Sequence, residues 1–210
     1  MPSTLWADPQ AGYSSLRSRI ESLPEPERSA RRKLFTTQEW HSWKLKAYDH
    51  QLPPQGDDWK IWTMIGPPRS GATRTGFEWA LDKLVYHPGP RVRVLGLMHH
   101  HKDVEYLDNR MWDELYRLWG GSRFRHQASG HAGMHAYFED KGQPYNEVHF
   151  MSERAVGDHG TYARDNKFDF VWADGIRDSE EVVRSYPNAH QFIFTNPDRL
   201  HPETLYSRAN

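Results

Sequence analysis

A segment of eight residues, Gly66 to Thr73, has the spacing of a phosphate-binding loop. It matches the pattern G-x-x-x-x-G-K-[ST] in its length, in both glycines and in the final threonine, but alanine stands where the pattern has lysine. Backbone N–H groups at the start of a helix can still bind an anion. The spacing by itself also fits an ordinary turn between a strand and a helix, so both interpretations stay open at this point.

The missing lysine would supply the positive charge that reaches the β- and γ-phosphates of a nucleotide. Arg69 inside the loop and Arg74 just after it are the nearest replacements, because arginine is permanently charged and grips phosphate with two donors. The residues predicted to contact the ligand are Gly66, Pro67, Pro68, Arg69, Ser70, Gly71, Ala72, Thr73 and Arg74.

A carboxylate at the end of a second apolar segment suits a metal ion. Residues 168–174 read as a buried strand that ends in Asp174, about a hundred residues after the loop. A carboxylate in that place would hold Mg²⁺ beside the hydroxyl of Thr73. The alternative is a buried parallel strand that ends in aspartate by chance. Asp178, Glu180 and Glu181 follow closely, but they also suit the first turn of the next helix.

The elements around these residues alternate between strand and helix. Strands are predicted over 60–65, 91–98, 168–174 and 191–195, and helices from Thr73 onward and over 103–119. Two more strands, 134–138 and 147–151, flank a turn, while the rest of 122–146 reads as loop and 152–165 has no periodicity. This order predicts an α/β fold with a mostly parallel sheet flanked by helices. Residues 1–48 are predicted as an N-terminal helical lead, with a helical stretch over 13–34 that is broken near residues 23–26 and a second helix over 37–48. Residues 49–210 are predicted as the α/β domain.

Composition excludes several classes of protein. The 210 residues contain no cysteine, which excludes disulfides and thiolate metal sites, and the formal net charge of -1 gives no overall basic signature for nucleic acid. No apolar run reaches the roughly 18 residues of a membrane span. A soluble protein of a reducing compartment, with no membrane partner, is therefore expected.

Two groups of histidines contain side chains of the type that binds metals. His99, His100 and His101 are adjacent, so a strand would point them to alternate faces, and a polar junction is the better interpretation. His131 and His135 are four apart, which suits a metal on a helix, but two nearby glycines disfavour a helix there. Neither group predicts a metal site.

A dense set of matches to a known family surrounds the loop. In order, the chain has Pro53-Pro54, Gly56, Asp58-Trp59, Trp62, Gly71, Thr73-Arg74, Gly76 and Glu78-Trp79. This segment resembles the start of the ATPase domain of phage terminase large subunits, in the branch that includes gene transfer agents. The resemblance covers residues 15–205 and is densest over 51–79 and 168–197. It ends near Arg208, so no nuclease domain is expected.

The resemblance implies a P-loop fold that binds ATP and Mg²⁺. It places Thr73 and Asp174 at the metal, and it places Asp174 and Thr195 in catalysis, with Thr195 sensing the γ-phosphate; Arg69 is predicted to join them. It also implies that a glutamine or an aromatic group in the lead-in contacts the nucleotide base, and the candidates are Gln51, Trp59 and Trp62, although both tryptophans also suit a buried core. The family has a glutamate after its metal-binding aspartate to orient the attacking water, and this chain has Gly175 in that position.

Two functions follow from the resemblance. One is an ATP-hydrolysing DNA-packaging motor domain, with double-stranded DNA, a phage portal, a small terminase subunit and a homo-oligomeric ring as partners in the host cytoplasm. The other is a pseudo-ATPase that keeps the fold without hydrolysis, which the absent lysine and glutamate favour. A structural α/β domain without nucleotide affinity is a third interpretation.

Overall fold

A computed structural model gives the structure of the chain and describes residues 15–34, 43–54, 56, 58–66, 70–86, 91–119, 124–129, 132–137, 145–157 and 159–196. The chain divides into two compact units, Met1–Pro54 and Gln55–Asn210, and each is described by itself. Within these described ranges, no helix combines the length and the apolar character that crossing a bilayer requires.

Short helices make up the described part of the first unit. They are α1 (Leu16–Glu21), α2 (Glu27–Arg32), α4 (Trp43–Lys46) and the 3₁₀ helix η2 (Asp49–Gln51). Helix α1 begins at Ser15, whose hydroxyl accepts a hydrogen bond from the Ser18 N–H at 3.1 Å. Ile20 and Leu45 form a small buried core. The predicted helical lead is confirmed, although residues 37–42 of the helix expected over 37–48 lie outside the described residues.

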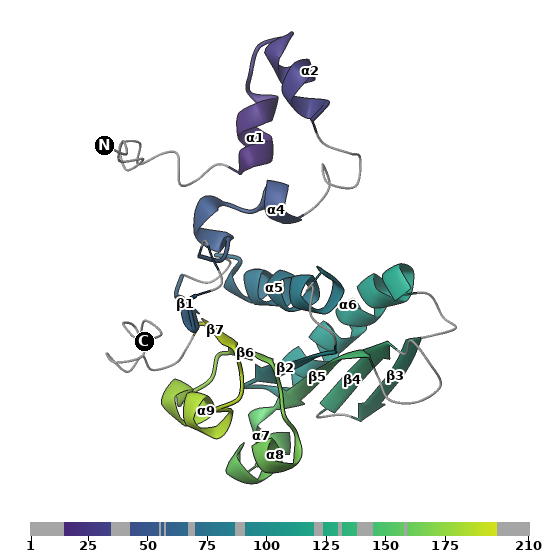
Figure 1. Cartoon of the computed structure of the whole chain (residues 1–210), viewed down its shortest axis with the longest axis vertical. Helices are drawn as coiled ribbons and strands as arrows, with labels where there is room; N and C mark the ends of the chain where they lie inside the picture. Colours follow the sequence, from purple (N-terminus) through teal and green to yellow (C-terminus); the bar gives the residue numbers. More distant parts are fainter. Residues whose placement is uncertain are drawn as a thin grey trace. The chain divides into compact units, whose positions relative to one another are not determined.

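The strands described in the second unit form one sheet in the order β1-β7-β6-β2-β5-β4-β3 (Figure 1). The first five strands in that order, from β1 to β5, form parallel pairs. Strand β4 pairs antiparallel with β5, and β3 pairs antiparallel with β4. The predicted mostly parallel α/β sheet is confirmed. The strands are β1 (Ile61–Met64), β2 (Val92–Met98), β3 (Phe124–Ser129), β4 (Ala132–Tyr137), β5 (Asn146–Ser152), β6 (Phe170–Asp174) and β7 (Gln191–Thr195).

Helices cover both faces of this sheet (Figure 1). On one face lie α5 (Ala72–Tyr86) and α6 (His101–Trp119), and on the other lie α7 (Glu153–Val156), α8 (His159–Asp165) and α9 (Ser179–Ser185). The central strands are therefore covered on both faces, which favours largely apolar sequences. Every residue of β7 is buried, as are the four residues of β6 that precede Asp174.

Three elements differ from the sequence prediction. Strand β3 and helices α7 and α8 fall in segments that were expected to be loop or irregular. Strand β3 has the sequence FRHQAS, which lacks β-branched residues and a clear alternation, so its pairing with β4 rather than its own pattern makes it a strand. Helix α7 has only four residues, too few to show a period, and it is capped by the Ser152 hydroxyl at 3.2 Å from the Ala155 N–H.

Helix α5 approaches the sheet closely at Gly76. A Cβ atom built at Gly76 would overlap the indole ring of Trp172, a buried residue of β6. The absence of a side chain thus allows α5, which carries the predicted phosphate-loop threonine at its start, to lie directly on β6.

We predict that Gly76→Ala lowers the free energy of unfolding by about 1–3 kcal/mol, the usual cost of overpacking a core. In an unobstructed helix the same change would stabilise the protein by roughly 1 kcal/mol. Urea denaturation checks the sign, and Lys102→Ala, at an exposed position of α6, is the control that should change stability by less than about 0.5 kcal/mol. A Gly76→Ala protein more stable than the unmodified chain would contradict the close contact.

Candidate functional site

The turn between β1 and α5 contains the predicted phosphate loop. Gly66 follows β1, and a Cβ atom there would lie 2.5 Å from the Ser70 hydroxyl. Gly71 has φ +86, in the left-handed region that favours glycine, and its carbonyl accepts the hydrogen bond of the Thr75 N–H at 2.9 Å. Residues 67–69 lie outside the described residues, so the contacts expected of Pro67, Pro68 and Arg69 stay predictions.

The carboxylate of Asp174 receives hydrogen bonds from two threonines. Thr73, at the start of α5, donates to Oδ2 at 2.8 Å, and Thr195, at the end of β7, donates to Oδ1 at 2.7 Å. These residues are far apart in the sequence, but the carboxyl ends of the parallel strands β6 and β7 meet at one edge, with Asp174 directly beside Thr195. The structure therefore brings together Thr73, Asp174 and Thr195, the three described residues expected at the metal or in catalysis.

Asn196 also belongs to this cluster. Its Nδ2 lies 3.2 Å from Oδ1 of Asp174 and 3.4 Å from the Thr73 hydroxyl oxygen. It has φ +48, a backbone conformation that asparagine tolerates better than most residues, and its N–H donates to the Met64 carbonyl at 3.0 Å. Asn196 is not among the site residues predicted from the sequence, although its place directly after a buried strand of a predicted parallel sheet is a signal for such a role.

A buried indole orients the hydroxyl of Thr195. The Nε1 of Trp172 donates to Thr195 Oγ1 at 2.8 Å, and an indole N–H can only donate. The threonine oxygen therefore accepts from Trp172 and directs its own proton toward Asp174. Burial raises the pKa of Asp174 above its ordinary value, and the hydrogen bonds from Thr195, Thr73 and Asn196 offset part of that effect.

Backbone bonds hold the neighbouring strand ends in place. The Gly175 N–H donates to the Thr195 carbonyl at 2.9 Å, and the His99 N–H donates to the Asp174 carbonyl at 3.1 Å. Gly175 has φ +68, so any other residue in this position would be strained. The glutamate that the resemblance implies at this position would therefore be strained here.

Arg74, the described one of the two predicted substitutes for the missing lysine, pairs with a carboxylate of its own helix. Ala72 begins α5 and is buried. Arg74 pairs with Glu78 at 2.5 Å, one turn along the same helix, and Glu78 also lies 3.4 Å from Arg110. Burial raises the pKa of Glu78, against the influence of Arg74 and Arg110. A phosphate contact by Arg74 stays a prediction.

Gln51 lies in the first compact unit, where its Oε1 accepts from the Tyr48 N–H at 3.0 Å. Its predicted contact with a nucleotide base stays a prediction.

The oxygen atoms of Thr73 and Asp174 suit Mg²⁺. This ion prefers oxygen ligands, usually one or two carboxylates together with phosphates and water. The Thr73 hydroxyl and the Asp174 carboxylate supply such oxygens next to the loop. The helix start beside them adds backbone N–H groups of the kind that bind phosphate.

We predict that Thr195→Val lowers the free energy of unfolding by about 1–3 kcal/mol, because valine leaves the Trp172 N–H buried without its acceptor. Thr195→Ser keeps the hydroxyl and is the matched control. Urea denaturation of both variants measures the difference. If the valine variant is as stable as the serine variant, the hydrogen-bonded chain from Trp172 to Asp174 does not contribute as described.

No family model and no curated protein sequence matches this chain. Solved structures do match its fold. The ATPase domain of the large terminase of Thermus phage P74-26 superposes with a TM-score of 0.54 and 14% identity, over 79% of this chain and 71% of that chain. A mutant of the same domain gives a TM-score of 0.53 and 13% identity, over 80% of this chain and 72% of that chain. The resemblance suggested by the loop and the β6 segment thus holds at the level of architecture, and the chain has the fold of a phage large terminase ATPase domain.

Proposed function

We propose that this chain is the nucleotide-binding domain of a DNA-packaging terminase of a phage or phage-like particle, in the branch that includes gene transfer agents. It binds ATP with Mg²⁺ at residues 66–73. The observation that carries the proposal is the convergence of Thr73, Asp174 and Thr195 beside a helix that follows a glycine-rich turn. A buried aspartate also needs hydrogen-bond donors for structural reasons alone, so the position of this threonine at the start of the helix after the glycine-rich turn is what supports a phosphate and metal site.

Within this proposal the residues have distinct tasks. Thr73 and Asp174 hold the metal, which neutralises charge on the β- and γ-phosphates when it is bound. The start of α5 faces the phosphates with N–H groups. Thr195 and Asn196 lie at the end of β7, where they connect the Asp174 carboxylate to the end of β1 through the Asn196 backbone.

Slow or absent hydrolysis is part of the proposal. Phosphoryl transfer depends on positioned charge, and two charged positions of the family are replaced by Ala72 and Gly175. The left-handed backbone of Gly175 is the specific observation that favours the second candidate, a pseudo-ATPase module that binds nucleotide as a structural ligand.

The partners follow by analogy with the fold. We expect double-stranded DNA, a portal, a small terminase subunit and further copies of the chain in a ring, in the host cytoplasm. The formal net charge of -1 requires that any DNA contact come from a local basic surface rather than from the whole chain.

We predict that ADP or ATP binds in a Mg²⁺-dependent manner and that Asp174→Asn weakens this binding roughly 5- to 150-fold, equivalent to about 1–3 kcal/mol for a lost charged contact. Asp165→Asn, an exposed position at the end of α8, is the matched control and should leave the affinity unchanged. Titration calorimetry with and without Mg²⁺ measures both. Equal affinities for the two variants, or binding that ignores Mg²⁺, would contradict the proposed metal position.

We predict that Ala72→Lys strengthens ATP binding and raises turnover, because it restores the charge that the loop lacks. Ala72→Met adds similar bulk without charge and is the control. Steady-state phosphate release should remain well below about 1 s⁻¹, the lower end of ordinary turnover, for the unmodified chain. Turnover at or above that rate without any substitution would show that another basic group already serves the site.

A further inference from the structure

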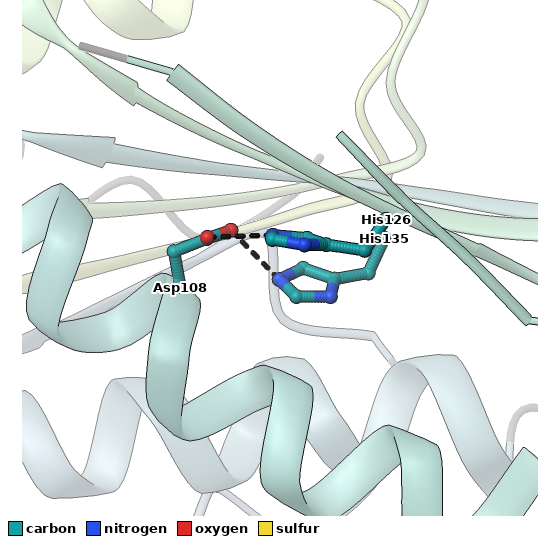
Figure 2. Close-up of side chains that lie close together, drawn as sticks. All are labelled: Asp108, His126 and His135. Carbon is teal, nitrogen blue, oxygen red and sulfur yellow. Dashed lines mark hydrogen bonds and ion pairs between the residues drawn. The ribbon is translucent and has the colours of Figure 1, made fainter. Parts of the chain in front are cut away.

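A second cluster of ligand-type side chains lies at the antiparallel end of the sheet. Asp108 comes from α6, His126 from β3 and His135 from β4 (Figure 2). One potential ligand atom from each residue lies within 4.8 Å of those of the other two. Strands β3 and β4 are at the opposite end of the strand order from β1, β7 and β6, so this cluster is separate from the proposed nucleotide site.

The two histidines are directly opposite each other in the β3–β4 pair. Cross-strand partners project from the same face of a sheet, and here the imidazole rings stack with their centroids 4.5 Å apart. Figure 2 shows both rings directed toward the Asp108 carboxylate. The Nε2 of His126 lies 2.7 Å from Oδ2, and the Nε2 of His135 lies 2.7 Å from Oδ1.

The surroundings leave room for this carboxylate and limit access of water. A Cβ atom at Gly133, two residues before His135 on the same strand, would overlap the Asp108 carboxylate. His135 is fully buried, and its ring packs edge-on against Phe150. Trp112, one turn after Asp108 on α6, packs edge-on against His126 with ring centroids 5.0 Å apart. Helix α6 thus contributes a ligand and a covering aromatic residue to the same place.

From these contacts we infer that Asp108, His126 and His135 form a binding site for a transition-metal dication, with Zn²⁺ as the best match. Two imidazole nitrogens and one carboxylate oxygen are ligands that Zn²⁺ takes, at about 2.0–2.2 Å each. A tetrahedral ion with three protein ligands leaves its fourth position to water. Mg²⁺ is a poor match because it prefers an octahedral set of oxygens.

The ion would fasten the β3–β4 hairpin to α6. Strand β3 is at the edge of the sheet and its sequence has little preference for a strand. A metal bound by residues from three elements stabilises the folded arrangement, because the ligands are not preassembled in the unfolded chain. In the absence of metal, the two hydrogen bonds of Asp108 hold the same side chains together.

The test uses the whole chain, freed of metal with a chelator, and Zn²⁺ or Co²⁺ as the only added ligand. We expect one tight Zn²⁺ per chain by titration calorimetry, a Zn²⁺-dependent rise in melting temperature, and the visible absorption of four-coordinate Co²⁺. His126→Gln should weaken Zn²⁺ binding by more than about 100-fold, since even changes to groups behind metal ligands cost roughly 10- to 100-fold. His126 is only partly buried, so this variant removes a ligand with little loss of core packing.

His190→Gln is the matched control, because His190 is an exposed histidine just before β7. It should bind Zn²⁺ and Co²⁺ as the unmodified chain does, which separates the site from weak binding by the other histidines among the 13 in the sequence. Equal Zn²⁺ affinity in the His126→Gln and His190→Gln proteins would overturn the inference. So would an unmodified chain that shows no tight Zn²⁺ binding and no four-coordinate Co²⁺ spectrum. Nucleotide binding is not used as a readout, so either proposal can fail alone.

Discussion

The proposed site depends on the hydrogen bonds that the desolvated carboxylate of Asp174 accepts from Thr73 and Thr195. A half-buried charge without partners is costly, and here hydroxyls from Thr73 and Thr195 supply the hydrogen bonds that offset this cost. Because these partners come from the start of α5 and the end of β7, the carboxylate connects elements that are far apart in the chain. The Thr73 hydroxyl and the Asp174 carboxylate are also the oxygens that a Mg²⁺ ion would bind. The same arrangement of side chains therefore stabilises the fold and suits a metal ion.

The order of the strands explains why these residues meet. In a parallel sheet all carboxyl ends lie at one edge, and β1, β7 and β6 are neighbours although β7 follows β1 by more than a hundred residues. Ligands of open α/β sheets commonly bind at this edge. The antiparallel strands β4 and β3 extend the sheet away from it, and the Asp108, His126 and His135 cluster is located there. The domain thus carries two separate groups of potential ligands.

The sequence predicted what local patterns control and missed what long-range pairing controls. The apolar run before Asp174 and the spacing of Gly66, Gly71 and Thr73 are local, and the structure brings Thr73 and Asp174 together. The pairing of Arg74 with Glu78 has helical i, i+4 spacing, so a local pattern predicts it as well, although the predicted site treats Arg74 only as a phosphate ligand. By contrast, local spacing relates His135 to His131, four residues away, as a possible second metal ligand. Its hydrogen-bond partner in the structure is Asp108, which is 27 residues away on another element. No spacing rule connects them, and β3 itself depends on its pairing with β4.

The central claim is that Thr73 and Asp174 hold the metal of a bound nucleotide. A crystal structure of the chain with ADP and Mn²⁺, which replaces Mg²⁺ and scatters anomalously, tests it most directly. The account predicts an anomalous peak beside Thr73 Oγ1 and the Asp174 carboxylate, directly or through one water, with the phosphates against residues 66–73. A nucleotide bound elsewhere, or a loop that stays empty while Asp174 keeps both threonine bonds at saturating ADP and Mn²⁺, would contradict it.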